Sequence, residues 1–280
     1  MPSLNNSNQG FGTKQKNFGY PPLEVHREKV FVVVKTAPRP SKKYREIVCT
    51  AGITQNGKWI RLYPINFRYM DFFLGYSKYQ WIDVEIEKSK NDPRIDSYHP
   101  FLKTLKLGEK LLTKADKTWS SRKKIVLPTA RTSLEELLSD YKKRKISLGI
   151  FKPKEIVDFK IEADNQDWSK AHKQVLSQQR LFEKQPKYLE RVPYKFSYRF
   201  ACNDKRCKGN HQLQIFDWEI YELYRRIKNS YRKPINEVLK DIKKKWLDEM
   251  WGENKDSYLI VGSVHKYPTF VVLGVFWPPK

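Results

Sequence analysis

The sequence contains few cysteines and no long apolar run. Three cysteines in 280 residues are too few for the disulfide framework of a secreted domain. No segment approaches the ~18 consecutive apolar residues that a membrane-spanning helix requires, and residues 1–22 lack the apolar core of a signal peptide. These absences predict a soluble, cytoplasmic protein with no membrane partner, whose thiols stay reduced and available to bind metal.

Familiar catalytic motifs are also missing. The chain has no G-x-S-x-G element, no P-loop and no G-x-G-x-x-G segment, so neither a serine-hydrolase elbow nor a nucleotide-hydrolysing loop is indicated. No cysteine lies beside a histidine suited to activate it as a nucleophile. The sequence leaves open whether the protein is an enzyme and favours a protein without catalysis of its own.

Acidic residues are scarce, since 31 Asp and Glu face 55 Lys and Arg, which gives a formal net charge of +24. A surface of this charge attracts polyanions at long range and binds them in a salt-dependent way. Nucleic acid, either RNA or DNA, is therefore the expected partner, alone or within a larger nucleoprotein complex. The alternative is a protein-interaction subunit whose charge serves only solubility.

The chain has enough apolar material for a large core, with 39% hydrophobic and 14% aromatic residues. Predicted strands and helices intermix without regular βα alternation, which indicates an α+β fold with largely antiparallel sheets or a partial barrel and peripheral helices. We expect a disordered tail at 1–22, a strand-rich basic domain at 23–130 and an α+β region with a Cys/His loop at 131–280, unless the two regions form one domain. The clearest strands are expected at 29–36, 80–88, 154–162, 194–202, 257–264 and 269–276, and helices at 133–145, 167–184, 217–231 and 234–252.

Two of the expected helices begin with capping residues. Ser133 followed three residues later by Glu136 forms a capping-box pattern at the start of the helix at 133–145. Asp217 is suited to cap the helix at 217–231.

The segment EIVCTAGITQNGKWIRLYPI, residues 46–65, is expected to form a β-hairpin. Asn56-Gly57 is a strong signal for a two-residue turn, and that turn fixes the register. It predicts two cross-strand pairs on the core face: Ile53 with Ile60 and Ala51 with Leu62.

The opposite face of this hairpin carries a row of Trp59, Arg61 and Tyr63. Aromatic rings stack on unpaired bases, and cations bind phosphates, so the row is a candidate nucleic-acid-binding surface. The alternative is a second core layer beneath helices, in which a buried Arg61 would need a partner. Nearby basic residues complete the predicted surface: Arg39, Lys42, Lys43, Arg45 and Arg68.

Cys202, Cys207 and His211 have the spacing C-x4-C-x3-H. Cysteine and histidine are the usual ligands of structural zinc, which takes four ligands, so the loop is a candidate Zn²⁺ site. His265 or Asp204 is the expected fourth ligand. The basic residues of the same loop, Lys205, Arg206 and Lys208, would then contact a phosphate backbone. The alternative is a basic loop with two thiols and no metal.

A second class of function is a metal-dependent nuclease or nucleic-acid-modifying enzyme. Asp83 and Glu85 share one face of the expected strand at 80–88, and Asp158 precedes Lys160 by two residues on another strand. Paired carboxylates bind Mg²⁺ in such enzymes. The alternative is that these are ordinary surface acids paired with Lys and Arg.

Three stretches of the sequence, VCTAGI with GKWIRLYPI, PYKFSYRFAC with DWEIYELY, and the closing VLGVFWPP, carry a resemblance to a known family. They resemble landmarks of a bacterial family of uncharacterised proteins, over most of residues 29–279, and the resemblance implies no activity. The strand-rich N-terminal half with its basic loop is also loosely similar to the small RNA-binding barrels of the PUA/ASCH kind, by analogy of fold.

Overall fold

The computed structural model describes residues 19–70, 75–177, 186–264 and 269–280. Most of the tail predicted at 1–22, the end of the helix predicted at 167–184, and His265 lie outside the described residues. Within the described residues, no helix is long and apolar enough to cross a membrane.

The chain forms the mixed α+β structure that the sequence predicted. The strands are β1 (His26–Lys35), β2 (Arg39–Ser41), β3 (Arg45–Thr54), β4 (Trp59–Ile65), β5 (Gln80–Lys88), β6 (Ser97–Pro100), β7 (Lys106–Lys110), β8 (Ala130–Arg131), β9 (Leu148–Phe151), β10 (Glu155–Ala163), β11 (Tyr194–Ala201), β12 (His211–Gln214), β13 (Tyr258–Ser263) and β14 (Phe270–Phe276). The α-helices are α1 (Ser120–Val126), α2 (Leu134–Arg144), α3 (Lys170–Ser177), α4 (Trp218–Asn229) and α5 (Ile235–Lys243).

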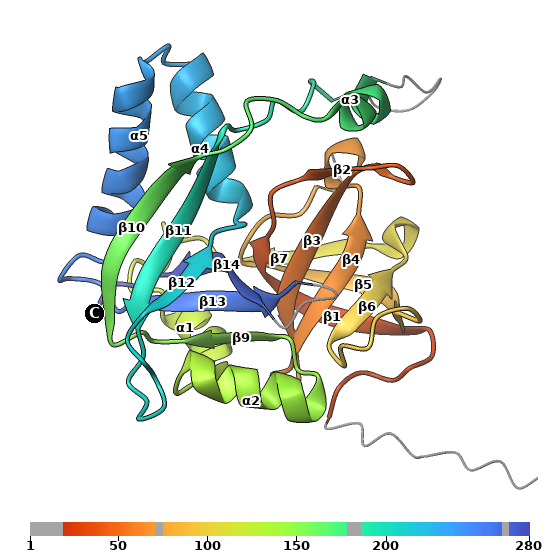
Figure 1. The fold of residues 1–280 in the computed structure, drawn as a ribbon. Coiled ribbons are helices and arrows are strands. Elements are labelled where there is room, and N and C mark those ends of the chain that lie inside the picture. The colour runs from red at the N-terminus through yellow and green to blue at the C-terminus, as the bar shows by residue number, and fades with distance from the viewer. Residues whose placement is uncertain (1–18, 71–74, 178–185, 265–268) are drawn as a thin grey trace, which may run out of the picture.

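Five strands of the N-terminal half form a partial barrel (Figure 1). Pairing runs from β1 through β3, β4 and β6 to β5, and β5 pairs again with β1. Only the β4–β6 pair in this ring is parallel. The interior is filled by apolar side chains that include Val30, Val32, Ile60 and Leu62.

The C-terminal half adds two further sheets. β10, β11 and β12 form a three-stranded antiparallel sheet, and β14, β13, β9 and β8 form a four-stranded one. Figure 1 shows α4 and α5 beside the three-stranded sheet and α2 along β9. Phe196, Tyr198 and Phe200, which the sequence placed on one face of β11, are all buried in the core with α4 and α5.

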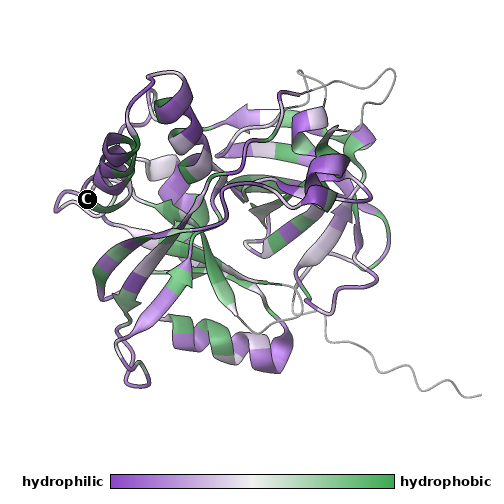
Figure 2. Cartoon of the chain, turned by 45° about the horizontal axis from the view of Figure 1, so that its top comes forward, coloured by the Kyte–Doolittle hydropathy of each residue, from purple (hydrophilic) through white to green (hydrophobic). Residues whose placement is uncertain are grey.

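The barrel and the four-stranded sheet share a core. One cluster of buried residues joins Phe31, Ile53 and Trp59 of the barrel to Ile260 and Leu273 of the sheet. Figure 2 shows hydrophobic residues concentrated on the strands in the middle of the molecule, with hydrophilic residues along loops and helix surfaces. The second half of β1 and the first residues of β4 are therefore buried on both faces, one inside the barrel and one against the C-terminal half.

Both predicted helix caps are confirmed. The Ser133 hydroxyl accepts a hydrogen bond from the Glu136 backbone N–H at 3.1 Å, and the Glu136 carboxylate binds the N–H of Thr132 at 2.8 Å. Asp217 Oδ1 accepts from the Glu219 N–H at 2.6 Å at the start of α4. The helix predicted at 234–252 begins at Ile235 and continues beyond α5 as a π-helical stretch, Lys244–Glu249.

The β3–β4 hairpin is shifted by one residue from the predicted register. Gly57 N–H donates to Thr54 C=O at 2.9 Å, and Thr54 N–H donates to Lys58 C=O at 2.9 Å, which gives a three-residue loop with Gly57 at φ +71°. A left-handed glycine closing a three-residue loop is the next commonest hairpin after the two-residue turn. The predicted pairs were therefore wrong, and the observed pairs are Ile53 with Trp59 and Ala51 with Arg61.

Candidate functional site

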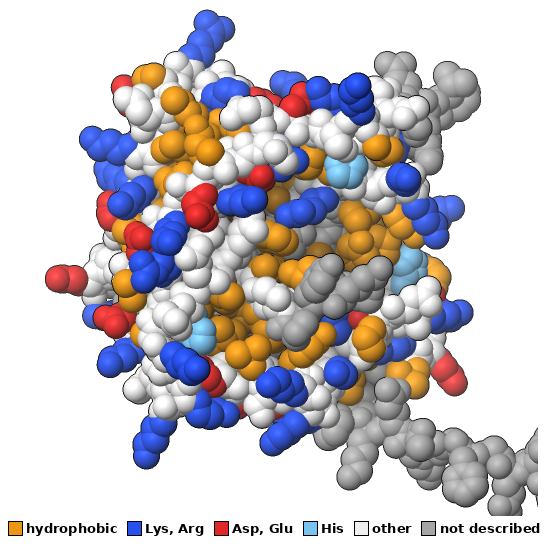
Figure 3. All heavy atoms as spheres, in the orientation of Figure 1, with side chains coloured by type: hydrophobic (Ala, Val, Ile, Leu, Met, Phe, Trp, Pro, Cys, Tyr) orange, Lys and Arg blue, Asp and Glu red, His pale blue; other side chains and the backbone are white. Residues whose placement is uncertain are grey.

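A cleft of about 800 Å³ lies between the barrel and the paired strands β13 and β14. Its lining comes from segments far apart in the sequence: the β2–β3 loop, the end of β4, the β5–β6 connection, Phe216 and β14. Figure 3 shows hydrophobic side chains gathered in a hollow in the middle of this face, with Lys and Arg side chains around it. The cleft thus combines an apolar interior with a cationic surround.

Cations and aromatic rings lie side by side at the rim. The Arg39 guanidinium carbon lies 4.4 Å from the centre of the Phe216 ring, and Lys43 Nζ lies 5.1 Å from the centre of the Tyr44 ring. Tyr63, which also lines the cleft, is 38% exposed. A rim of this kind can hold phosphates with its cations while its rings contact a flat base.

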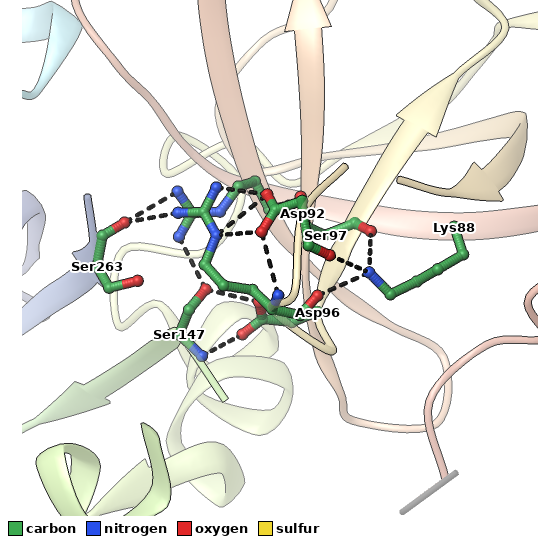
Figure 4. Close-up of polar contacts among 8 residues, drawn as sticks. Lys88, Asp92, Asp96, Ser97, Ser147 and Ser263 are labelled. Carbon is green, nitrogen blue, oxygen red and sulfur yellow. Dashed lines mark hydrogen bonds and ion pairs between the residues drawn. The ribbon is translucent and has the colours of Figure 1, made fainter. Parts of the chain in front are cut away.

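A buried polar network closes the cleft floor and joins the two halves of the chain (Figure 4). Arg61 donates to Ser147 Oγ at 3.0 Å and to the Ser263 carbonyl at 3.3 Å, and Arg94 donates to the same carbonyl at 2.8 Å. Asp96 accepts from the N–H and the hydroxyl of Ser147, at 2.5 Å and 2.6 Å. Burial raises the pKa of Asp96, and the positive charge of Arg61 opposes this shift. The network therefore depends on Arg61 to balance a buried carboxylate.

Trp59 and Arg61 do not present the open face that the sequence suggested. Trp59 is 5% exposed and Arg61 is 6% exposed, and the Trp59 indole donates to Thr129 Oγ1 at 2.9 Å. The prediction of an exposed row was wrong for these two residues, which are buried as the alternative of a second core layer expected, although a sheet and not helices covers them. The two side chains are buried because the four-stranded sheet, rather than solvent, covers the outer face of β4.

The other predicted basic residues are divided between three environments. Arg39 and Lys43 line the cleft, and Lys42 is exposed in the same loop. Arg45 is buried with its guanidinium carbon 4.7 Å from the Tyr69 ring centre, and Arg68 donates to both carboxylate oxygens of Glu46, at 2.9 Å and 2.8 Å. Lys205, Arg206 and Lys208 lie in the β11–β12 loop, and none of them lines the cleft.

Three of the predicted metal ligands, Cys202, Cys207 and His211, come together with a fourth residue that the sequence did not suggest. Cys202, Cys207, His211 and Glu135 each offer a ligand atom, and these four atoms all lie within 4.8 Å of one another. In tetrahedral zinc sites, ligand atoms are separated by roughly 3.4–3.8 Å, as follows from metal–ligand distances of about 2.0–2.3 Å. To hold a zinc ion, the wider pairs of ligand atoms would move closer together, and Glu135 Oε1 and His211 Nε2, which are 2.6 Å apart, would move apart.

Glu135, from the first turn of α2, takes the place for which the sequence suggested His265 or Asp204. Its Oε1 lies 2.6 Å from His211 Nε2, and its Oε2 is buried without a hydrogen-bond partner among the described residues. Asp204 instead accepts a hydrogen bond from Ser133 Oγ at 2.6 Å and pairs with Arg206. His265 lies outside the described residues.

The backbone around Cys207 suits a thiolate. The Cys207 sulfur accepts hydrogen bonds from the backbone N–H groups of Cys202, at 3.2 Å, and of Gly209, at 3.3 Å. Hydrogen bonds to ligand atoms orient them and support their charge in metal sites. Burial is the main reason that the pKa of Cys202 rises to about 12, so a nearby cation would favour ionisation of this thiol.

The carboxylates proposed for a nuclease are placed on two separate sheets. Asp83 and Glu85 lie on β5, where Arg27 binds both, at 2.6 Å and 3.2 Å. Asp158 and Lys160 lie on β10 of the three-stranded sheet. These residues therefore do not form one constellation within the described structure.

Sequence reasoning missed several residues of the cleft. Ile47, Cys49, Tyr44, Arg94 and Phe216 line the cleft but were not among the predicted binding residues. Alternation along β3 cannot distinguish a cleft wall from a core face, because both are apolar. Phe216 carried one usable signal, since it precedes the capping Asp217 and so had to lie at an element boundary.

Comparison with known families gives two matches that together span most of the chain. The model of a domain of unknown function, DUF8757, matches residues 130–280, more than half of the chain. A second domain of unknown function, DUF8758, matches residues 26–128. No curated protein matches the sequence.

Proposed function

The chain belongs to the DUF8757 family, and we propose that it is a nucleic-acid-binding protein that holds an unpaired segment of RNA or DNA in its cleft. It would act as an accessory or recognition protein without catalysis of its own. One observation carries the proposal: cation–aromatic pairs stand at the rim of an apolar cleft of about 800 Å³ in a chain with a net charge of +24.

The shape of the site favours an unpaired strand over a duplex. A cleft that recedes between two sheets admits a single base but not the stacked rod of a double helix. Within it, a base would contact Tyr44, Tyr63 or Phe216, while its phosphates lie against Arg39 and Lys43. Base stacking on aromatic side chains contributes about 1–3 kcal/mol per base and tolerates any sequence. The similarity to PUA/ASCH barrels noted from the sequence points the same way, by analogy.

A structural zinc ion is the second part of the proposal. Cys202, Cys207, His211 and Glu135 would hold it, and it would fasten the β11–β12 loop to the start of α2. Zinc bound at such a site stabilises the fold because its binding free energy is coupled to folding. The exposed Lys205 and Lys208 of that loop would then add a second, weaker attraction for phosphates.

Removing two cations from the rim together tests whether the cleft binds nucleic acid. The double variant Arg39→Ala with Lys43→Ala should weaken binding of a fluorescent 12-nucleotide single strand by roughly tenfold or more, because it removes both rim cations and their phosphate contacts. Fluorescence anisotropy measures the dissociation constant at fixed salt.

The matched control is the double variant Lys205→Ala with Lys208→Ala, which removes the same charge from exposed positions outside the cleft. It should weaken binding by no more than about threefold, through loss of general attraction. Equal losses in the two double variants would show that the cleft is not the binding site.

Salt dependence tests the role of charge. Affinity for the same single strand should fall at least about tenfold between 50 and 200 mM salt, because neutralised phosphates release counterions. The Arg39→Ala, Lys43→Ala variant should show a shallower slope of log affinity against log salt. A flat profile for the unaltered protein would contradict binding through these cations.

A further inference from the structure

A second cavity, of about 340 Å³, lies at the start of α4 and shares no lining residue with the cleft. Segments from the end of β1, the start of β5, β7 and α4 converge on it. Three lysines, two carboxylates and two aromatic rings line the space: Lys35, Lys78, Lys110, Asp217, Glu219, Tyr79 and Trp218. Neither the cleft nor the metal cluster uses any of these residues.

The two innermost lysines have different surroundings. Lys78 Nζ lies 2.9 Å from Glu219 Oε2 and 3.9 Å from Asp217 Oδ2, and these charges outweigh the cost of burial and raise the pKa of Lys78. Lys35 forms no salt bridge within the described part of the chain. Its amine donates to the Tyr76 carbonyl at 3.2 Å and lies 3.9 Å from the centre of the Phe67 ring.

Lys35 therefore combines partial access with an apolar setting. The residue is partly exposed, and its Nζ is also 5.4 Å from the Trp218 ring centre. Burial lowers the pKa of Lys35 to about 8, although Glu219 and Asp217 favour its charged form while Lys78 and Lys110 oppose it. A lysine of this kind has a free lone pair much more often at neutral pH than a lysine in water.

Asp217 supplies a proton-carrying group in the wall of the same cavity. One carboxylate oxygen caps α4, whereas Oδ2 is buried and has no hydrogen-bond partner within the described residues. β14 approaches this oxygen so closely that a Cβ on Gly274 would lie 2.8 Å from it. Burial raises the pKa of Asp217 to about 7 against the opposing charge of Lys78, so the carboxyl can hold a proton near neutrality.

We propose that this cavity is an imine-forming site, in which the Lys35 amine reacts with an aldehyde that carries a phosphate group. Desolvated lysines beside other cations are the usual nucleophiles in such chemistry. Lys78 and Lys110 would attract the phosphate, and the apolar wall of Phe67 would keep the amine out of bulk water.

The reaction needs no oxidant or reductant. The neutral Lys35 nitrogen attacks the carbonyl carbon, a C–N bond forms, and the carbonyl oxygen gains the proton that the nitrogen loses. The Asp217 carboxyl then donates its proton to this hydroxyl, water leaves, and the product is a protonated imine beside the Asp217 carboxylate. Hydrolysis reverses the sequence.

Such an aldehyde has two sources, a free phosphorylated metabolite or an abasic nucleotide, whose ring-opened sugar is an aldehyde flanked by phosphates.

The first arm of the experiment treats the full-length protein at pH 7.5 with pyridoxal 5′-phosphate and then borohydride, and maps the reduced adducts by peptide mass spectrometry. Lys35 should be labelled at least about tenfold faster than the exposed Lys205, because its amine is more often neutral. Labelling of Lys35 should increase as pH rises through about 8.

The second arm replaces the probe with a single strand that contains one abasic site, and measures covalent trapping by borohydride on a denaturing gel. Trapping at Lys35 identifies nucleic acid as the source, and labelling by pyridoxal phosphate alone identifies a small metabolite. Pyridoxal without its phosphate should label Lys35 at least several-fold more slowly, and Lys110→Met should remove most of this difference.

The proposal is overturned if Lys35 in the unaltered protein is labelled no faster than Lys205, or if both arms give adducts elsewhere. Because this comparison is made within one folded protein, it does not depend on the stability of a Lys35→Met variant. Its outcome is independent of binding at the cleft, which the anisotropy experiment measures.

Discussion

Serine in place of Cys207 is expected to remove zinc from the protein and to lower its stability by several kcal/mol. The loop that carries this residue also holds Lys205, Arg206 and Lys208, and it has little apolar surface of its own to fix it. Loss of a metal ligand therefore removes the main link between the loop, β12 and α2. Elemental analysis should find about one zinc per chain before the substitution and almost none after it, and the melting temperature should fall by roughly 5–10 °C.

Cys49→Ser is the matched control, since it makes the same change in a cysteine that lines the cleft and lies outside the metal cluster. It should retain zinc. Glu135→Gln should weaken zinc binding, and His265→Ala should not, which separates the fourth ligand proposed from the structure from the one that the sequence suggested. Purified protein without metal, whose melting temperature is unchanged by a chelator, would contradict the metal site.

Methionine in place of Arg61 is expected to destabilise the protein by about 3–5 kcal/mol. The substitution keeps much of the apolar stem but leaves Asp96, which is fully buried, without its compensating charge. The substitution also removes the buried hydrogen bonds of Arg61 to Ser147 Oγ and to the Ser263 carbonyl. Each buried polar group that loses its partner typically costs about 1–3 kcal/mol. Denaturant unfolding followed by circular dichroism gives the change in free energy.

Arg39→Met is the control for this measurement, because it makes the same chemical change at an exposed position and should change stability by less than about 0.5 kcal/mol. A loss below about 1 kcal/mol for Arg61→Met would show that Asp96 is satisfied by Ser147 alone. That result would show that Arg61 does not stabilise the fold by favouring the charge of Asp96.

Local signals predicted the fold class and the helix caps well. Ser133 and Asp217 were found from the sequence because a cap is decided by residues two or three positions away. The hairpin register failed because Asn56-Gly57 fits both a two-residue and a three-residue loop, and only packing of Trp59 against the four-stranded sheet distinguishes them.

The candidate sites also show that local sequence patterns do not identify residues that only the fold brings together. Cys202, Cys207 and His211 lie within ten residues and could be recognised as a group, whereas Glu135 is 76 residues before His211 and joins them only through the fold. Likewise Arg39 was identified as a binding residue, but its aromatic partner Phe216 is supplied by the opposite half of the chain. Sites assembled from distant segments require the tertiary arrangement.

The core shared by the barrel and the four-stranded sheet has a consequence for synthesis of the protein. Phe31, Ile53 and Trp59 are covered by residues of β13 and β14, the last strands of the chain. Translation at ~5–20 residues per second leaves an interval on the order of 10 s between the barrel and these strands. During that interval the outer apolar face of the nascent barrel is open to water, so we expect it to be a part of the nascent chain that is prone to aggregation.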